Sequence, residues 1–232
     1  MKDASSGEAE AQNSLGDMYF EGYETEQDYK EAFKWYLRAA EQGHGMAQYY
    51  VALAQYVLAK MFIDGQYIEQ DLTKGLDLLQ KASDQGLALA QYDLGTIYCE
   101  GKIVESDIDN GVEYLKLAAD QGNKDGQFNL GLAYTNLSEP DYDMAEKYLL
   151  EASYNGHFKA IFELSRLYTL YKKDYRQGLL WVIVALEYCE TVDEQRYKRI
   201  KSGLESKLST ADRESISAEA RDIIATLDAS LY

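Results

Sequence analysis

The sequence predicts an all-α fold: a right-handed α-solenoid superhelix of five helix-hairpin repeats, followed by C-terminal capping helices. Three observations predict this fold. One motif of helical character recurs five times, a second helical motif alternates with it, and the 232 residues contain a single proline, so that little interrupts the helices. Apolar residues make up 46% of the chain, which is enough for stacked hairpins to bury a core.

The first motif predicts the first helix of each repeat. It reads AQNSLGDMYFEG, and its later copies read AQYVLAKMFIDG, AQYDLGTIYCEG, GQFNLGLAYTNL and AIFELSRLYTLY; the five copies start at Ala11, Ala54, Ala90, Gly126 and Ala160. Ala11, Leu15 and Tyr19 stand four residues apart and therefore share one helix face. We expect the small residue after the leucine, such as Gly16, to let another helix approach closely.

The second motif predicts the second helix. It reads WYLRAAEQG, LLQKASDQG, YLKLAADQG and YLLEASYNG, with a degenerate fifth copy; the copies start at Trp35, Leu78, Tyr114, Tyr148 and Trp181. We expect Tyr19 or Trp35 to fill the space beside the small residues. An aspartate precedes each second helix and is predicted to be its N-cap: Asp28, Asp71, Asp107, Asp141 and Asp174. Four copies end in a glycine suited to a left-handed C-cap: Gly43, Gly86, Gly122 and Gly156.

The motifs predict a repeat array over residues 1–190 and a helical C-terminal cap over 191–232. The repeat boundaries are expected at about 8–44, 45–87, 88–122, 123–156 and 157–190. In the cap, the capping-box patterns Thr191-x-x-Glu194 and Ser209-x-x-Asp212 predict helices near 192–207 and 210–228.

A seven-residue insertion distinguishes the second repeat. Ala47-Gln48 begins the first motif, and Ala54-Gln55 begins it again. Because seven residues make nearly two helical turns, we expect the first helix of this repeat to be two turns longer than its siblings. Two interpretations stay open: the added turns pack against repeat one, or Tyr49, Tyr50 and Tyr56 form an aromatic contact surface for a partner.

The two motifs together resemble the Sel-one-like repeat, a longer relative of the tetratricopeptide repeat. The resemblance covers about Gly7 to Glu190 and is carried by A-Q-x-x-L-G-x-x-Y-x-x-G followed by an Asp-led helix with W-Y-x-x-A-A-E-Q-G. It implies a non-catalytic scaffold or adaptor, in this case a bacterial one, that binds other proteins. Some bacterial members are immunity proteins for secreted toxins, so the resemblance also implies that alternative. A third hypothesis is a structural, self-assembling module.

The net charge and the motifs limit the classes of partner and of function that the sequence favours. The net charge of −17 disfavours nucleic acid and anionic lipid and favours a protein partner with a basic surface. No stretch is apolar enough to insert into a membrane. We find no catalytic motif, and we predict no enzyme activity, no cofactor and no metal. His44 and His157 are interpreted as turn residues, and Cys99 and Cys189 as free thiols. A cytoplasmic location is expected, unless a removed signal peptide places the protein in the periplasm or outside the cell.

Partner-binding residues are predicted from positions of the first helices that do not repeat. A helix face that packs against neighbours should keep its residue type, and these positions do not, so we expect them on the concave face. Ordinary drift of solvated residues is the competing interpretation. The candidates, with the tyrosines beside them and those of the insertion, are Asp17, Tyr49, Tyr50, Tyr56, Lys60, Tyr92, Asp93, Thr96, Asn129, Glu163 and Arg166.

Overall fold

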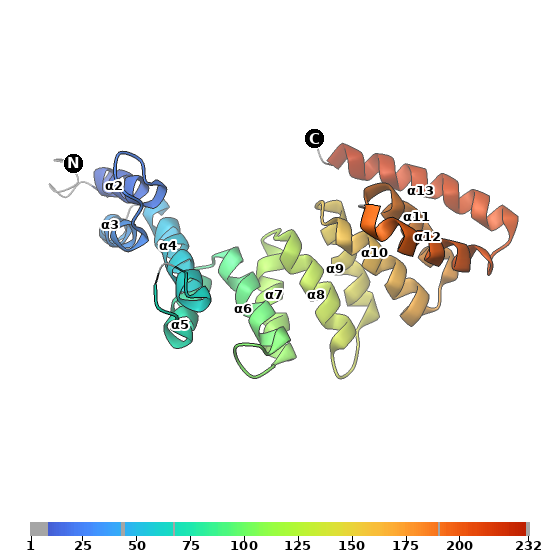
Figure 1. Ribbon diagram of the computed structural model, residues 1–232, viewed down its shortest axis with the longest axis horizontal. Coiled ribbons are helices and arrows are strands. Elements are labelled where there is room, and N and C mark those ends of the chain that lie inside the picture. Colours follow the sequence, from blue (N-terminus) through green and yellow to red (C-terminus); the bar gives the residue numbers. More distant parts are fainter. Residues whose placement is uncertain (1–8, 43–44, 67, 190, 231–232) are drawn as a thin grey trace. The chain divides into compact units, whose positions relative to one another are not determined.

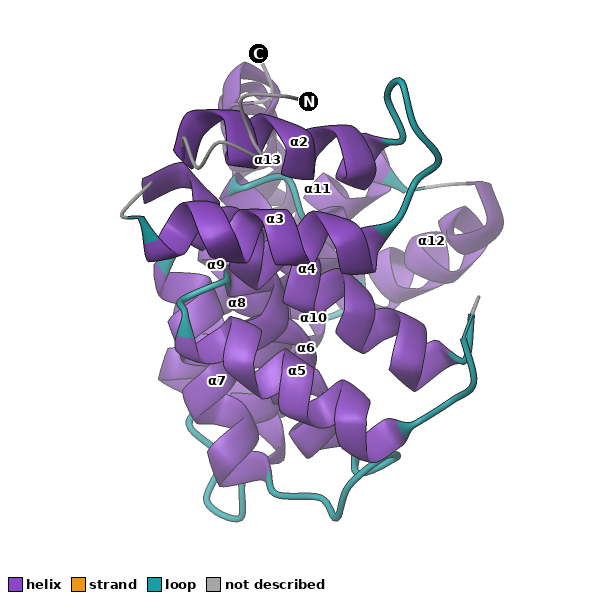
Figure 2. Ribbon diagram, turned by 90° about the vertical axis from the view of Figure 1, so that its left-hand side faces the viewer, coloured by secondary structure: helices purple, strands orange, loops and turns teal. Residues whose placement is uncertain are grey.

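The computed structural model describes residues 9–42, 45–66, 68–189 and 191–230 (Figure 1). Every regular element in these residues is a helix, and none of them forms a strand (Figure 2). The predicted all-α fold is therefore confirmed. The contacts divide the chain into two compact units, Met1–Ser106 and Asp107–Tyr232, called unit 1 and unit 2 below.

Each unit is a succession of helices joined by short connections. Unit 1 contains α2 (Ala9–Glu21), α3 (Tyr29–Glu41), α4 (Gly45–Asp64), α5 (Leu72–Asp84) and α6 (Ala88–Glu100). Unit 2 contains α7 (Ile108–Asp120), α8 (Lys124–Asn136), α9 (Tyr142–Tyr154), α10 (Phe158–Arg166), the π-helix η1 (Leu167–Lys172), α11 (Tyr175–Tyr188), α12 (Thr191–Glu205) and α13 (Thr210–Ser230).

The aspartates begin the second helices as predicted. The side chain of Asp141, for example, accepts hydrogen bonds from the backbone N–H groups of Asp143 and Met144, at 3.2 and 3.0 Å. The same kind of bond is made at Asp28, Asp71, Asp107 and Asp174. The closing glycines have positive φ at Gly86, Gly122 and Gly156, whereas Gly43 and His44 lie outside the described residues. Local sequence therefore determines where these helices begin and end.

Small residues bring the two helices of a hairpin together. A Cβ atom placed on Gly16 of α2 would lie 2.5 Å from two ring carbons of Tyr36 on α3, and a Cβ on Gly131 of α8 would lie 2.8 Å from Cγ of Leu149 on α9. Tyr36 and Leu149 are almost fully buried. The expectation that Trp35 or Tyr19 fills this space was wrong. Tyr36, the residue after Trp35, occupies it, and Trp35 and Tyr19 are only half-buried.

A hydrogen bond between a buried and an exposed amide joins the same two helices in three hairpins. The Nε2 atom of Gln42 donates to Oε1 of Gln12 at 2.7 Å, and Gln85 donates to Gln55 at 2.6 Å. In unit 2 the Nδ2 atom of Asn155 donates to Oε1 of Gln127 at 2.8 Å. The acceptor is in each case the glutamine of the AQ or GQ dipeptide, and it is buried. The pair satisfies a polar group that burial would otherwise penalise.

Helix α4 is longer than its siblings, as predicted. It has 20 residues, whereas α2, α6 and α8 have 13 each. The added turns pack partly against repeat one: Ala47 is fully buried, and the ring of Tyr50 stacks on Tyr36 with their centroids 4.9 Å apart. Tyr49, on the next face, is 52% exposed. The packing interpretation therefore holds for part of the insertion, and a partner-contacting role for Tyr49 stays a prediction.

The tail helices cover the last hairpin of unit 2. They lie close to the predicted bounds, and Ser209 and Asp212 form the predicted capping box, with each backbone N–H donating to the other side chain. Ile216, Ala220 and Leu227 of α13 are buried in the same core as α11. Repeat five departs from the others, because its first helix ends after Arg166 and continues as the π-helix.

Candidate protein interface

One face of α4 exposes apolar and aromatic side chains in unit 1. We call Met46, Tyr49, Leu53, Tyr56 and Lys60 the α4 row. Met46 is 57% exposed and Tyr49 52%, while Leu53, Tyr56 and Lys60 are half-buried. The opposite side of α4 enters the core and includes Val51, Ala54, Leu58 and Phe62. An isolated exposed leucine is ordinary on a protein surface, but an aligned row on one helix is a candidate interface.

The first helices that precede and follow α4 carry exposed and half-buried acidic residues. Helix α2, which contacts α4, presents Glu10, Asp17 and Glu21 at helical spacing, and helix α6 presents Asp93 and Glu100. Glu10, Glu21 and Glu100 are exposed, and the two aspartates are half-buried. We call these five residues the acidic border. Since Lys60 is the one cation among the ten residues of the row and border, the surface carries a local negative potential.

The structure brings three of the predicted site residues into contact between α4 and α6. Nζ of Lys60 lies 3.2 Å from Oδ2 of Asp93, and the hydroxyl of Tyr56 donates a hydrogen bond to Asp93. Burial first, and then Asp93, raises the pKa of Tyr56 above its ordinary range, so the phenol stays a neutral donor. Tyr92 is close enough to Tyr56 to raise that pKa further, and Thr96 lies on the same helix and is half-buried.

Two predicted site residues also make contacts within the first hairpin and its neighbour. Asp17 accepts a hydrogen bond from the buried Tyr36 hydroxyl at 2.9 Å and another from Nδ2 of Asn13 at 3.2 Å. Tyr50 packs in the core cluster of α3 and α4, against Tyr36. The proposed aromatic surface of three tyrosines is therefore divided, with Tyr49 exposed, Tyr56 half-buried and Tyr50 packed inside.

The remaining predicted residues lie in unit 2. Arg166 Nη1 and Glu163 Oε2 form an ion pair of 2.7 Å within α10, and both side chains line a cavity of about 230 Å³ together with Leu132 and Tyr171. Asn129 is half-buried on α8. Because Glu163 and Arg166 neutralise each other, this part of the first-helix surface lacks the acidity of unit 1.

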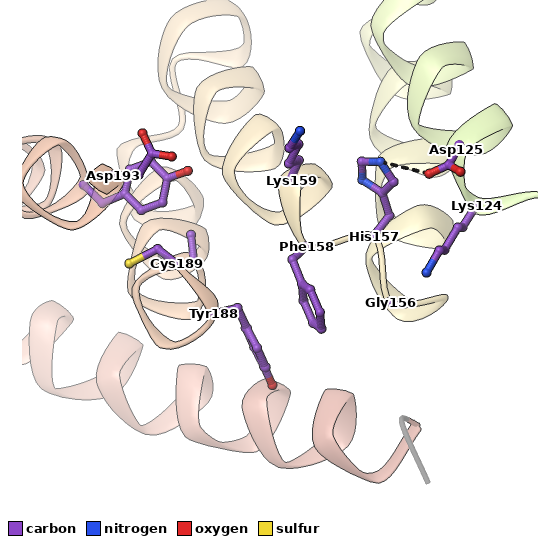
Figure 3. A pocket seen from close by; sticks show the side chains of 11 residues that line it. Lys124, Asp125, Gly156, His157, Phe158, Lys159, Tyr188, Cys189 and Asp193 are labelled. Atoms are coloured by element: carbon purple, nitrogen blue, oxygen red, sulfur yellow. Dashed lines mark ion pairs between the residues drawn. The ribbon is translucent and has the colours of Figure 1, made fainter. Parts of the chain in front are cut away.

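A larger cavity in unit 2 was missed by the sequence analysis. It has a volume of about 500 Å³ and is lined by the beginnings of α8, α10 and α12 and by the end of α11. Figure 3 shows the Phe158 ring between His157 and Tyr188, and the latter stacks on Phe158 with centroids 4.9 Å apart. Lys124 and Lys159 balance Asp125 and Asp193 in the lining, so the cavity has no net charge with which to attract an ion.

His157 is the buried titratable group of this cavity. Its side chain is 13% exposed, its ring stacks on Phe128 with centroids 4.1 Å apart, and its Nε2 atom lies 3.4 Å from Oδ1 of Asp125. Burial lowers the pKa of His157 below its ordinary value, and the opposing effect of Asp125 is smaller. The neutral imidazole is therefore the form that the folded unit favours.

This pKa shift predicts an acid sensitivity of unit 2. A histidine whose folded pKa is depressed contributes stability that is present above its unfolded pKa and is lost as the pH falls through the folded pKa. We expect wild-type protein to lose stability relative to His157→Phe between about pH 7.5 and about pH 5, since phenylalanine keeps the stacking but does not titrate. Urea unfolding of both proteins across this pH range measures the difference between their free energies of unfolding. The titration of the carboxylates contributes equally to both proteins and so drops out of this difference. A constant difference would contradict the shift.

The described residues contain no group of histidine, cysteine, aspartate and glutamate side chains that could hold a metal ion. None of their helices is long and apolar enough to cross a membrane. Neither Cys99 nor Cys189 forms a disulfide within the described residues, and burial raises the pKa of Cys189.

Comparison with known proteins identifies the family. The Sel1 repeat model matches residues 9–44, 52–87, 88–123 and 124–157. A Sel1 repeat protein from Oxalobacter formigenes has a TM-score of 0.61 at 24% identity, covering 94% of this chain and 89% of its own. The protective antigen c5321 of uropathogenic Escherichia coli, which displays an SLR fold, has a TM-score of 0.58 at 29% identity; the match covers 91% of this chain and 48% of that one.

The chain thus spans about half the length of the E. coli antigen. The immunity protein Pa5087 from Pseudomonas aeruginosa is similar at 20% identity with a TM-score of 0.41, over 91% of this chain and 83% of its own. No curated protein matches the chain. Sel1 repeat proteins generally mediate protein–protein interactions through a fold that is generally a non-catalytic scaffold. Because the family model matches more than half of the residues, this protein belongs to the Sel1 repeat family.

Proposed function

We propose that this protein is a non-catalytic interaction module that binds a protein partner on the first-helix face of unit 1. The observation that carries the proposal is the pair of exposed apolar side chains, Met46 and Tyr49, on turns that only the second repeat possesses. Tyrosine is enriched among the residues that dominate binding energy at protein interfaces. The added turns contribute such a tyrosine, Tyr49, to the α4 row.

The site is assembled so that part of it is rigid before binding. Tyr56 and Lys60 are held by Asp93, and Tyr50 is held by Tyr36, so these side chains lose little further freedom when a partner arrives. Met46 and Tyr49 are the most exposed side chains of the row, and the Tyr49 ring already contacts the Tyr50 ring with centroids 5.6 Å apart. Preorganisation of this kind raises affinity because fewer rotamers are immobilised on association.

Narrower hypotheses about the partner stay predictions. A cognate secreted toxin with a basic surface would fit the net charge of −17, and the protein would then be its immunity factor. Self-assembly is disfavoured by the same charge, because two copies repel each other. The predicted cytoplasmic location is also untested.

Photo-crosslinking in the source organism tests the proposal. A photoreactive phenylalanine analogue replaces Tyr49 in one variant and Leu37, which is 39% exposed on α3, in a matched control. We expect a discrete protein adduct from position 49 and none from position 37. An adduct from position 37 alone would place the interface on the second helices and overturn the proposal.

A further inference from the structure

The spacing within the α4 row matches the contact seam between two packed helices. Met46, Tyr49, Leu53, Tyr56 and Lys60 alternate steps of three and four residues, which is the a and d pattern of a heptad repeat. Such a pattern keeps one stripe of side chains facing a second helix along its length. In the described structure this stripe is at least partly exposed over its whole length.

The insertion extends this stripe without rotating it. Seven residues correspond to one heptad, so the added turns contribute one further pair of seam positions, Met46 and Tyr49, in phase with Leu53 and Tyr56. The stripe spans fifteen residues, or about 21 Å of helix. That length accommodates about four turns of a partner helix, which is close to an average helix in a globular protein.

The acidic residues of the neighbouring helices predict which residue types a partner helix would carry on either side of its apolar stripe. The acidic border belongs to the first helices that precede and follow α4: Glu10, Asp17 and Glu21 are on α2, and Asp93 and Glu100 are on α6. Asp93 contacts Lys60 and Tyr56 of the row directly. A helix packed along the α4 row would direct its flanking side chains toward the helices that carry these carboxylates, as the residues beside a coiled-coil seam meet charges of the partner. Lysine and arginine complement them, whereas glutamate and aspartate would be repelled.

We propose that the α4 row is the docking seam for a basic amphipathic α-helix of the protein partner. This inference rests on the proposed function and specifies the class of its ligand. The apolar stripe of the incoming helix packs on Met46, Tyr49, Leu53 and Tyr56, and its basic flanks meet the acidic border. A second copy of this chain is a poor occupant, since its own α4 row has the same acidic border.

Synthetic peptides test this assignment with purified full-length protein. The probe is a fluorescein-labelled 21-residue peptide with leucine at a and d and lysine at the flanking positions. One control has the same composition with the leucines scrambled, and a second replaces each lysine by glutamate. By fluorescence polarisation we expect the probe to bind at least about tenfold more tightly than either control, and more weakly as salt rises. Equal binding of the scrambled peptide would show charge attraction alone and overturn the seam.

Two pairs of variants locate the binding. Met46→Ala with Tyr49→Ala should weaken probe binding by about tenfold or more, whereas Leu37→Ala, an exposed leucine on α3, should leave it unchanged. Glu21→Lys should weaken binding and its salt dependence, whereas Glu41→Lys on α3 makes the same change in net charge with a smaller effect. All of these side chains are exposed, so unchanged melting temperatures verify the fold. Equal effects within each pair would overturn the location.

The two proposals fail in different ways. If a native partner crosslinks at position 49 but its crosslinked segment is neutral, acidic or extended, the interface stands and the helical seam is wrong. If neither a partner nor the basic helical probe reaches position 49, the proposed function is itself refuted.

Discussion

Leu149→Ala is expected to lower the free energy of unfolding of unit 2 by about 2–5 kcal/mol. Leu149 is 1% exposed and belongs to the core that continues through α10, α11 and α13. Its side chain lies directly over Gly131, so truncation opens a cavity against a backbone that has no side chain to fill it. Urea unfolding followed by Trp181 fluorescence, in a Trp35→Phe background, reports on unit 2 alone, because the two tryptophans lie in different units.

A second substitution in the same place sharpens this prediction. Gly131→Ala alone should destabilise unit 2 by about 1–3 kcal/mol, because its Cβ would lie 2.8 Å from Leu149 Cγ. In the double variant that clash is absent, and the new methyl group fills part of the cavity. We therefore expect the double variant to lose less free energy of unfolding than the two single variants lose in total. Gly203→Ala is the control: nothing lies within 4 Å of its Cβ, and it should stabilise α12 slightly. Strict additivity of the first two changes would contradict the packing described.

Tyr36→Ala is expected to destabilise unit 1 by about 3–5 kcal/mol, the usual cost of removing a buried aromatic ring. The ring is fully buried, covers Gly16 and stacks on Tyr50. Tyr36→Phe keeps all of these contacts and removes only the hydroxyl that donates to Asp17. We expect this change to cost about 1 kcal/mol, because water can reach the half-buried carboxylate.

Hydrogen exchange measures the effect on each helix. Faster exchange in α2, α3 and the first turns of α4, with unit 2 unchanged, is the expected result for Tyr36→Ala. A loss of protection spread evenly over all helices would show that the two units unfold as one and would contradict a local role for the Tyr36 ring.

The parts of the fold that depend on local sequence could be predicted from it. The aspartate caps, the helix periods and the extra length of α4 each follow from residues close together in the chain. Tyr98 shows where the periodic pattern overstates burial: it shares the recurrent face with Leu94, which is 2% exposed, yet it is only half-buried. The pattern identifies which face a residue occupies, but the neighbouring helix decides how completely that face is covered.

The candidate interface was predicted less well, because tertiary contacts decide which of its residues are exposed and which are paired or buried. Variable positions drew attention to Lys60 and Asp93, but variability could not show that they pair with each other. Asp17 varies between repeats because it serves the one buried tyrosine hydroxyl of its hairpin. The cavity around His157 gathers residues from four helices, and no spacing in the sequence brings those helices together.

The amide pairs between the helices of a hairpin explain where the chain can change length. A hydrogen bond between two amides is directional, so a hairpin whose helices slipped by one turn would leave the buried glutamine acceptor without its partner. Gln55 has kept its pairing with Gln85 because all of the additional residues of α4 precede Ala54. In this scaffold a first helix can therefore be lengthened ahead of its AQ dipeptide, in steps of seven, with the hairpin behind it unaltered. That makes the beginning of each first helix the natural position at which to graft a longer recognition surface.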